Sequence, residues 1–320
     1  MVLKVLLTGS AGFIGSHVAE ALLARGDEVV GVDNFNDYYN PVRKERNLRV
    51  ACTNKNFTLY RTDLRNYEAL ETIIKHERPD KICHLAGMAG VRYSLKYPLL
   101  YEEVNVKGTQ NLLELARLFG IPHFVMASSS SVYGGRTNVP FNEEDRVDFP
   151  PHPYAATKRA AELLGYTYSH VFDLKVTALR FFTVYGPRNR PDMAVYLFTN
   201  AIDRDVPINL FGDGSARRDW TFVLDTVRGV IASLDRPFNY EIINLGNSNT
   251  HTEMDFIRAA EKALGKPALI NYLERPASEP LITFADISKA RRLLDFEPVT
   301  TFEEGYSRFF DWYKSEGREG

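Results

Sequence analysis

Cysteine is scarce in this chain, with only two in 320 residues. Cys52 and Cys83 lie far apart and form no Cys-x-x-Cys pair. This pattern argues against a disulfide framework and against a zinc cage, and it fits a reducing compartment, so we expect a cytoplasmic protein. The seven histidines do not have the spacing of metal ligands, and we expect no metal site.

Long hydrophobic runs are also missing. No apolar stretch approaches the ~20 residues that a membrane-spanning helix needs. The first residues read as a strand that contains Lys4 and leads into a Gly-rich turn, which is not the pattern of a signal peptide. We therefore expect no membrane partner.

Neither sign of charge dominates, because the formal net charge is -2 and there is no long acidic or basic block. Nucleic acids are usually bound by a positively charged stripe, so we expect no nucleic-acid partner. With 44% hydrophobic and 25% charged residues, the composition is that of a globular protein. The length corresponds to one large or two modest domains.

The first half of the chain alternates short β-rich runs with longer amphipathic segments, which predicts β-α-β units and parallel strands. The fold class is therefore α/β, with a Rossmann-type doubly wound parallel sheet. The expected strands are residues 2–7, 27–32, 57–61, 80–85, 123–128 and 175–181, and the expected helices are residues 13–25, 67–76, 98–119 and 153–172.

The second half has loops rich in Pro, Gly and Asp, which we interpret as a smaller, discontinuous α/β lobe for the substrate. Helical patterns lie near residues 252–263, 286–294 and 302–314. The expected division assigns residues 1–182 and about 214–250 to the sheet domain, and residues 183–213 and 251–320 to the smaller lobe.

The stretch LLTGSAGFIGSH places Gly9, Gly12 and Gly15 between a strand and a helix. Glycines there permit a tight turn and a close backbone approach to a pyrophosphate, whose charge meets the helix N-terminus. Asp33 ends the next strand, where its carboxylate would accept ribose hydroxyls and repel a 2′-phosphate. A bare glycine turn with a solvated aspartate is the alternative, but the strand–turn–helix setting favours a dinucleotide site, and the Asp33 carboxylate favours NAD over NADP.

Further cofactor contacts are expected from the ends of the other strands. Asp63 and Leu64 follow the third strand, at the adenine edge, and HLAG ends the fourth, where small residues permit close approach. Beyond the three glycines and Asp33, the expected cofactor residues are Phe13, Ile14, Asn34, Asp63, Leu64, Leu85, Ala86 and Gly87.

The stretch YAATK places Tyr154 and Lys158 one helical turn apart. An ammonium group and a cationic nicotinamide would both stabilise the phenolate and lower the pKa of Tyr154 from its ordinary value of about 10. The stretch ASSSSVYG follows the fifth strand, at the edge where such sheets bind ligands. Tyr-x-x-x-Lys alone reads as a surface pair, but its place after a dinucleotide motif and a serine-rich strand end favours catalysis.

Together these motifs resemble the extended short-chain dehydrogenase/reductase superfamily over essentially the whole chain. Within it, the stretches DNFNDYY, AGVRYS, SSSSVYG, YAATK and RFFTVYGPRNRPDMA are similar to those of the UDP-glucuronate 4-epimerase family. The resemblance implies tightly held NAD, a UDP-sugar substrate and hydride chemistry at sugar C4. A transient 4-keto sugar would turn over and be reduced on its opposite face.

Matched residue by residue, the resemblance implies that Ser129, Tyr154 and Lys158 are catalytic and that Asn105 lies near the nicotinamide ribose. It implies substrate contacts by Ser94, Ser129, Ser130, Thr183, Arg190, Phe211, Arg218, Arg275 and Glu279. Arg218 matches the arginine directed at the diphosphate. Arg275 is a weaker match, because the family often has Arg-x-x-Asp where this chain has Glu279. Phe211 either flanks the uracil or belongs to the core.

The stretch RFFTVYGPRNRPDMA carries Arg188 and Arg190 on a Gly-Pro loop. We expect Thr183 to end the sixth strand beside the sugar C4, and Arg190 to hold the C6 carboxylate of a uronate. Holding it out of line with the carbonyl π system would keep a 4-keto uronate from losing carbon dioxide. In the alternative reading, both arginines are solvated loop charges or bind the UDP phosphates.

Other functions stay open. A neutral UDP-glucose/UDP-galactose 4-epimerase would have the same central motifs. Dehydratases of the superfamily have an Asp–Glu pair, and decarboxylases a Glu, where this chain has Ser130 and Ser131, which argues against both. A non-catalytic NAD-binding protein would not need the Ser–Tyr–Lys set. The family also implies a homodimer, in which helices near residues 98–119 and 153–172 pair as a four-helix bundle.

Overall fold

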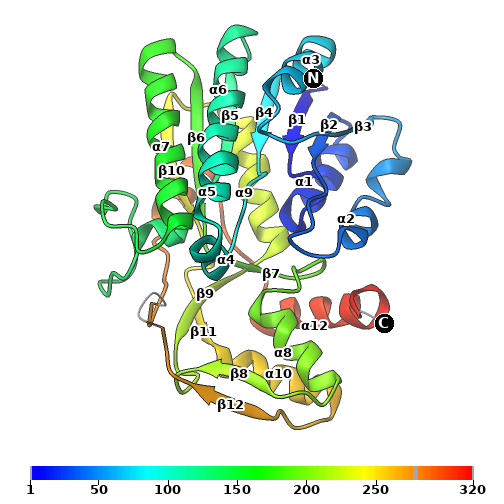
Figure 1. Ribbon diagram of the computed structural model, residues 1–320, viewed down its shortest axis with the longest axis vertical. Coiled ribbons are helices and arrows are strands. Elements are labelled where there is room, and N and C mark those ends of the chain that lie inside the picture. The colour runs from blue at the N-terminus through cyan, green and yellow to red at the C-terminus, as the bar shows by residue number, and fades with distance from the viewer. Residues whose placement is uncertain (1, 277–279, 319–320) are drawn as a thin grey trace.

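The computed structural model describes residues 2–276 and 280–318. In this described part of the chain, seven parallel strands form one sheet in the order β10-β6-β5-β4-β1-β2-β3 (Figure 1). The doubly wound sheet is thus confirmed, and all six expected strands belong to it. The strands are β1 (Lys4–Thr8), β2 (Glu28–Asp33), β3 (Phe57–Arg61), β4 (Lys81–His84), β5 (His123–Ser129), β6 (Lys175–Phe181) and β10 (Tyr240–Leu245).

Strand β10 was not expected from the sequence. It pairs in parallel with β6, at one edge of the sheet. Its sequence, YEIINL, is interrupted by Glu241 and Asn244, and its first half is only partly buried. An edge strand has a neighbour on one side alone, so it does not need the continuous apolar run by which the inner strands were recognised.

Helices cover both faces of the sheet. One core cluster packs on the first face and a second cluster on the other. Figure 1 shows the two long helices α6 and α7 side by side on the second face. The first face is covered by α1 (Phe13–Ala24), α9 (Val223–Asp235) and α11 (Ser288–Leu294), and the second by α3 (Tyr67–Glu77), α6 (Gly108–Leu118) and α7 (Pro153–Phe172).

The segment expected as one helix over residues 98–119 has three parts. Helix α5 (Pro98–Tyr101) passes into a π-helical stretch (Glu102–Lys107), which passes into α6. The wider π turns change the direction in which side chains leave the helix, and such stretches are frequent at functional sites. Asn105, which the family resemblance places near the cofactor, lies in this stretch and is 2% exposed.

The second half of the chain contributes the lower part of the molecule in Figure 1. Strands β11, β9 and β7 form one small sheet, and β12 and β8 form another. The first core cluster extends without a break from the large sheet into this part. The remaining elements are β7 (Thr183–Tyr185), β8 (Ile208–Phe211), β9 (Arg217–Phe222), β11 (Thr250–Thr252), β12 (Ile270–Leu273), α2 (Pro41–Asn47), α4 (Val91–Lys96), α8 (Ala194–Asp203), α10 (Glu253–Leu264), α12 (Phe302–Trp312), the 3₁₀ turns Ala51–Thr53 and Ser130–Tyr133, and a π turn (Tyr313–Gly317).

The expectation that Thr183 ends the sixth strand is wrong. Strand β6 ends at Phe181, and Thr183 opens β7 in a different sheet. Phe182 lies between the two strands and is buried. The chain thus leaves the large sheet before Thr183. Among the described residues, no helix combines the length and apolar character that crossing a membrane requires.

The strand order reverses between β1 and β4. The chain moves outward in one direction through β2 and β3, and in the other through β4, β5 and β6. At such a switch point the loops that follow the two central strands part, and a crevice opens at the carboxyl edge of the sheet. Gly9 follows β1 there, and Leu85 to Gly87 follow β4.

Candidate active site

A cavity of about 350 Å³ opens at this crevice. It extends from the glycine turn after β1 to the serine-rich end of β5, and the loop after β7 closes one side. Most residues expected from the sequence line it, namely Gly9, Gly12, Phe13, Ile14, Gly15, Asp33, Asn34, Asp63, Leu64, Leu85, Ala86, Gly87, Ser129, Ser130, Tyr154, Lys158, Thr183 and Arg190.

The glycine turn fits a diphosphate on geometric grounds. A Cβ at Gly15 would lie 2.0 Å from the carbonyl oxygen of Gly9, so no side chain can stand there. Gly12 caps α1 without a side-chain hydrogen bond, and the first turn of α1 has no acidic residue. The N–H groups at the start of α1 are therefore available to an anion, whose charge the helix dipole stabilises.

Asp33 lies at the end of β2, where two backbone groups fix its carboxylate. Oδ2 accepts a hydrogen bond from the Ala11 N–H at 3.1 Å, and Oδ1 accepts one from the Phe35 N–H at 2.8 Å. Lys44 Nζ is 3.8 Å from Oδ1 and also lines the cavity. Burial lowers the pKa of Lys44, and Asp33 opposes this effect. Sequence reasoning missed Lys44, because it is on the short helix α2 with no motif around it.

Helix α7 begins immediately before the predicted catalytic tyrosine. The His152 ring accepts a hydrogen bond from the Ala155 N–H at 3.1 Å, and Pro153 occupies the first turn, so two local signals fix this helix start. The His152 ring also stacks on Tyr154 with centroids 6.2 Å apart, and the Tyr101 ring meets Tyr154 edge-on at 6.1 Å. The phenol is therefore held by its neighbours before any ligand enters.

Tyr154 and Ser129 both line the inner end of the cavity. Burial raises the pKa of Tyr154, while the nearby Ser129 hydroxyl and the charge of Arg190 act against the increase. Arg190 is thus a cation that favours the phenolate, and the same effect expected of Lys158 stays a prediction. The Lys158 ammonium instead donates to the Ala127 carbonyl at 2.9 Å, and burial lowers its pKa to about 8.

The arginine loop divides its two charges between different places. Arg188 forms an ion pair with Glu20 at 2.6 Å, outside the cavity lining. Arg190 lines the cavity and pairs twice with Asp192, through Nε at 2.9 Å and Nη2 at 2.7 Å. The Tyr38 hydroxyl donates to the same carboxylate at 2.9 Å. These interactions hold the Arg190 guanidinium in one orientation.

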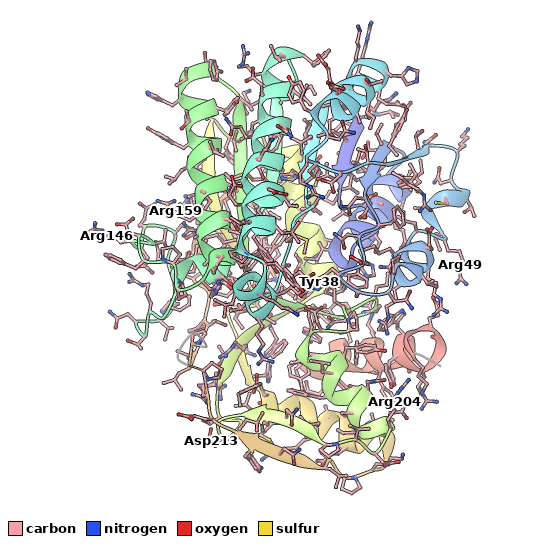
Figure 2. The ribbon with its side chains drawn as sticks, viewed as in Figure 1. Tyr38, Arg49, Arg146, Arg159, Arg204 and Asp213 are labelled. Atoms are coloured by element: carbon pink, nitrogen blue, oxygen red, sulfur yellow. The ribbon has the colours of Figure 1, made fainter. Side chains whose placement is uncertain are left out.

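Tyr38 lies where the carboxyl edge of the sheet faces the smaller lobe (Figure 2). Its ring contacts Tyr93 edge-on at 4.8 Å. Gly90 has a φ of +97°, and a Cβ there would lie 2.5 Å from the Tyr38 hydroxyl oxygen. Both the positive backbone angle and the nearby phenol therefore require a glycine at this position. Sequence reasoning missed the contact between Tyr38 and Asp192, although Tyr38 lies in the stretch DNFNDYY and Asp192 in the stretch RFFTVYGPRNRPDMA.

Several expected residues lie outside the cavity lining. Asn105 accepts from the Met88 N–H at 2.7 Å and donates to Met88 O at 3.0 Å, so it braces the backbone that follows β4. The Ser94 hydroxyl donates to the Val91 carbonyl at 2.6 Å inside α4. Neither side chain is directed to the cavity by these bonds, and the assigned roles of both stay predictions.

Phe211, Arg218 and Arg275 lie outside the cavity lining, on the smaller lobe. The guanidinium of Arg92 stacks on the Phe211 ring at 4.2 Å, so α4 contacts the end of β8. Arg275 lies 3.8 Å from Asp213, which Figure 2 shows at the edge of this lobe. Arg218 donates to the Arg217 carbonyl at 3.1 Å on β9. Glu279 lies outside the described residues.

The carboxylates of the cavity lie at one end. Among the described residues that line it, Asp33 and Asp63 are the acidic ones, and both follow strands on the glycine side of the sheet. The inner end offers hydroxyl, phenol, ammonium and guanidinium groups. No group of three or more His, Cys, Asp or Glu residues in the described part of the chain could hold a metal ion.

Comparisons with known proteins find relatives over nearly the whole chain. Residues 6–309 match the family model described as GDP-mannose 4,6 dehydratase. A UDP-glucuronate 4-epimerase of Thermodesulfobacterium geofontis (strain OPF15) is 46% identical over 310 residues, which cover 97% of this chain and 95% of that protein.

Solved structures are similar over the same length. The UDP-glucuronic acid 4-epimerase of Bacillus cereus in complex with UDP-glucuronic acid and NAD has a TM-score of 0.91 and 37% identity, with 98% of this chain and 99% of that chain covered. The UDP-glucose 4-epimerase of Thermotoga maritima with UDP-glucose has a TM-score of 0.90 and 29% identity, with 99% and 100% covered.

Proposed function

The chain belongs to the extended short-chain dehydrogenase/reductase family that the GDP-mannose 4,6-dehydratase model describes, and from this premise we propose that it is an NAD-dependent UDP-glucuronate 4-epimerase. It inverts C4 of UDP-glucuronate to give UDP-galacturonate through a 4-keto intermediate. The observation that carries the proposal is the convergence of Ser129, Tyr154 and Arg190 at the inner end of a cavity whose other end is the glycine turn. The relatives named above act on, or are bound to, this class of substrate.

The glycine side of the cavity suits NAD. The N–H groups at the start of α1 would bind the diphosphate, and Asp33 would accept the adenosine ribose hydroxyls. Bound NAD would supply the acceptor and donor of hydride for sugar C4. Lys44, beside Asp33, partly neutralises that carboxylate, so the preference for NAD over NADP rests on the hydroxyl-accepting geometry as well as on charge.

The protein's own groups move the proton of the C4 hydroxyl. Tyr154 is the base that removes it and later returns it, and the neighbouring Ser129 hydroxyl shares it. The charge of Arg190 favours the phenolate form of Tyr154 against burial. Lys158 fixes the strand end through Ala127 O and keeps a positive charge next to the reacting centre.

Arg190 is placed to recognise the uronate carboxylate. Asp192 occupies Nε and one Nη2 proton, and a guanidinium has five N–H donors, so further donors remain for a substrate. A charge-assisted bond from them would hold the C6 carboxylate in a fixed rotamer. That rotamer would keep the carboxylate out of line with the C4 carbonyl and prevent loss of carbon dioxide.

Elimination of water is disfavoured by the distribution of acids. The carboxylates of the described cavity lining lie on the cofactor side, and Ser130 and Ser131 line its inner end. A hydroxyl is too weak an acid or base to take the role of a dehydratase's carboxyl pair. One observation does favour a neutral substrate: Asp192 already pairs with Arg190, so a UDP-glucose 4-epimerase is the second candidate.

The deciding experiment uses purified protein with UDP-glucuronate and no added NAD, followed by chromatography of the products. Formation of UDP-galacturonate supports the proposal, and conversion of UDP-glucose alone would transfer the assignment to the second candidate. Arg190→Ala should lower kcat/KM for UDP-glucuronate by roughly 10²-fold, the loss of one charge-assisted contact. Equal losses on UDP-glucose would refute the role of Arg190 in carboxylate recognition.

We also propose that the protein is a homodimer that pairs through α6 and α7. Leu163, Tyr166 and Val171 on α7 and Leu118 at the end of α6 are half-exposed apolar side chains on these neighbouring helices. Exposed apolar side chains gathered on two neighbouring helices are typical of an interface. Light scattering of the wild type and of Leu163→Glu tests it, and a wild-type monomer would contradict it.

Two further expectations from the sequence remain proposals. The cytoplasmic location is supported by Cys52 and Cys83, which are both free thiols. The division into residues 1–182 with about 214–250, and residues 183–213 with 251–320, is supported by β10 and α9. Both elements come from the second half of the chain and pack in the large sheet layer.

A further inference from the structure

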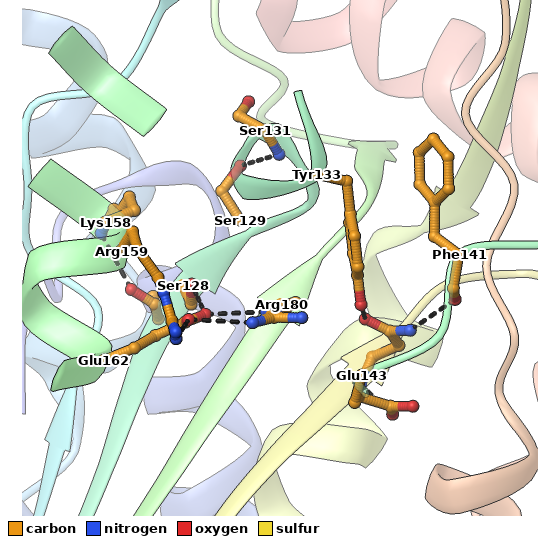
Figure 3. A network of polar contacts seen from close by, with 12 residues as sticks. Ser128, Ser129, Ser131, Tyr133, Phe141, Glu143, Lys158, Arg159, Glu162 and Arg180 are labelled. Atoms are coloured by element: carbon orange, nitrogen blue, oxygen red, sulfur yellow. Dashed lines mark hydrogen bonds and ion pairs between the residues drawn. The ribbon is translucent and has the colours of Figure 1, made fainter. Parts of the chain in front are cut away.

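A buried ion pair lies directly behind the serine-rich end of β5. Glu162 on α7 is 0% exposed and Arg180 on β6 is 1% exposed. Arg180 donates to the Glu162 carboxylate from Nε at 2.8 Å and from Nη2 at 2.9 Å, and Arg159 adds a third bond at 3.0 Å (Figure 3). Removing two charges from water is costly unless the geometry is good and the remaining oxygens are bonded. Both carboxylate oxygens of Glu162 are bonded here, next to the reaction site, while Arg180 Nη1 has no hydrogen-bond partner among the described residues.

Glu162 also reaches β5. The Ser128 hydroxyl donates to Glu162 Oε1 at 2.6 Å. One turn earlier on α7, Lys158 donates to the Ala127 carbonyl at 2.9 Å, and one turn earlier still Tyr154 lies near Ser129 at the inner end of the cavity. Residues four apart lie on one face of a helix. One face of α7 therefore meets three consecutive residues of β5.

Arg180 extends the network to the segment that follows β5. Its guanidinium carbon lies 4.8 Å from the centre of the Tyr133 ring, in a cation–π contact. The Tyr133 hydroxyl donates to Asn244 Oδ1 on β10 at 2.7 Å. Figure 3 shows the Arg180 guanidinium between the Glu162 carboxylate and this tyrosine. The short turn that carries the serines is thus fixed at both of its ends.

The same carboxylate faces the buried lysine of the site. Glu162 raises the pKa of Lys158 against the larger effect of burial. His84 at the end of β4 also lies near this ammonium, and burial lowers its pKa to about 3, so it stays neutral. The Glu162 carboxylate itself is paired with Arg180 and Arg159.

We propose that Ser128 and Glu162 are positioning residues of the reaction site. Their hydrogen bond, anchored by Arg180, holds the end of β5 in register with α7 and so sets the contact between Ser129 and Tyr154. The kinetic part of this inference rests on the proposed epimerase activity, and the structural part does not.

Ser128→Ala tests the network with the smallest change, and Ser169→Ala is its matched control. The Ser169 hydroxyl is also buried on α7 and donates to the Asn239 carbonyl at 2.6 Å, but at the opposite end of the helix. With UDP-glucuronate, Ser128→Ala should lower kcat about tenfold with little change in KM, as expected for misplaced reacting groups. Ser128→Thr should restore most of the rate. Equal kcat values for the two alanine variants would overturn the positioning role.

Crystal structures of the wild type and both alanine variants decide the positioning role without using activity. We expect the distance between the Ser129 and Tyr154 oxygens to grow in Ser128→Ala and to stay unchanged in Ser169→Ala. An unchanged distance in Ser128→Ala would overturn the inference. A wild type that converts no UDP-sugar would refute the proposed function, and the crystallographic result would still decide the positioning role.

Discussion

Replacing Lys158 with methionine should stabilise the protein and inactivate it at the same time. The lysine is 7% exposed, and burial lowers its pKa from the ordinary 10.5 to about 8, with Glu162 acting in the opposite direction. At neutral pH the chain therefore holds a charged ammonium in a place that disfavours charge. Methionine has a similar length and no charge, so it removes that cost together with the function.

The magnitude follows from the change in pKa. A fall from 10.5 to about 8 corresponds to a cost of about 3 kcal/mol for the charged form in the folded state. Methionine also loses the bond to the Ala127 carbonyl, which costs about 1 kcal/mol. The net gain in the free energy of unfolding is about 2 kcal/mol, or roughly 3 °C in Tm for a chain of this length.

The pH dependence has a definite sign. Because the pKa of Lys158 is lower in the folded than in the unfolded protein, the unfolded chain binds more protons between pH 8 and 10.5. The stability of the wild type therefore rises with pH through that window, and below it the cost is fully present. The advantage of Lys158→Met should be full at neutral pH and should vanish as pH 10.5 is approached.

Urea denaturation of both proteins across this pH range, with equal nucleotide content, measures the effect. Lys266→Met is the control, because the Lys266 ammonium is 39% exposed and pairs with Asp205 at 2.8 Å. It should give no comparable gain. A Lys158→Met protein that is less stable than the wild type at neutral pH, or a difference that does not vary with pH, would refute the reasoning. Its rate on UDP-glucuronate should fall by at least ~10²-fold.

Two further predictions concern the cradle and the framework. Gly15→Ala should yield folded protein that no longer retains nucleotide, because the new Cβ would lie 2.0 Å from Gly9 O. Gly135→Ala is the control and should retain the nucleotide, because the space around Gly135 is open. Extraction and chromatography of the bound nucleotide measure this, and full retention in Gly15→Ala would contradict the prediction. Asp219→Asn should lower the free energy of unfolding by about 2–4 kcal/mol. The buried carboxylate accepts the N–H groups of residues 247, 248 and 285, and an amide nitrogen cannot accept them; unchanged urea denaturation would disprove this role.

Much of the sheet and of the site was readable from the sequence, because local patterns encode them. The glycine turn lies between a strand and a helix, and Asp33 ends the next strand, as expected. Tyr154 and Lys158 are one turn apart on a helix whose start His152 and Pro153 mark. Such features depend on neighbours in the chain, so spacing alone predicts them.

The rest depends on contacts between segments far apart in the sequence. The pairing of Asp192 with Tyr38 joins two loops that have no periodic pattern. The pKa of Tyr154 reflects burial and Arg190, which no i,i+4 spacing reveals. The π-helical turns around Asn105 have the same amphipathic pattern as an ordinary helix, so the expected continuous helix was wrong there.

The position of β10 has a consequence for how the chain must be assembled. Residues 240–245 complete one border of the large sheet beside β6, and α9, which precedes them, covers the same side of the sheet as α1. A nascent chain that ends near residue 182 would have an unpaired strand border and a bare apolar surface, both of which favour aggregation. Synthesis must therefore proceed well beyond Tyr154 and Lys158 before the nucleotide-binding half can become a finished, protease-resistant unit.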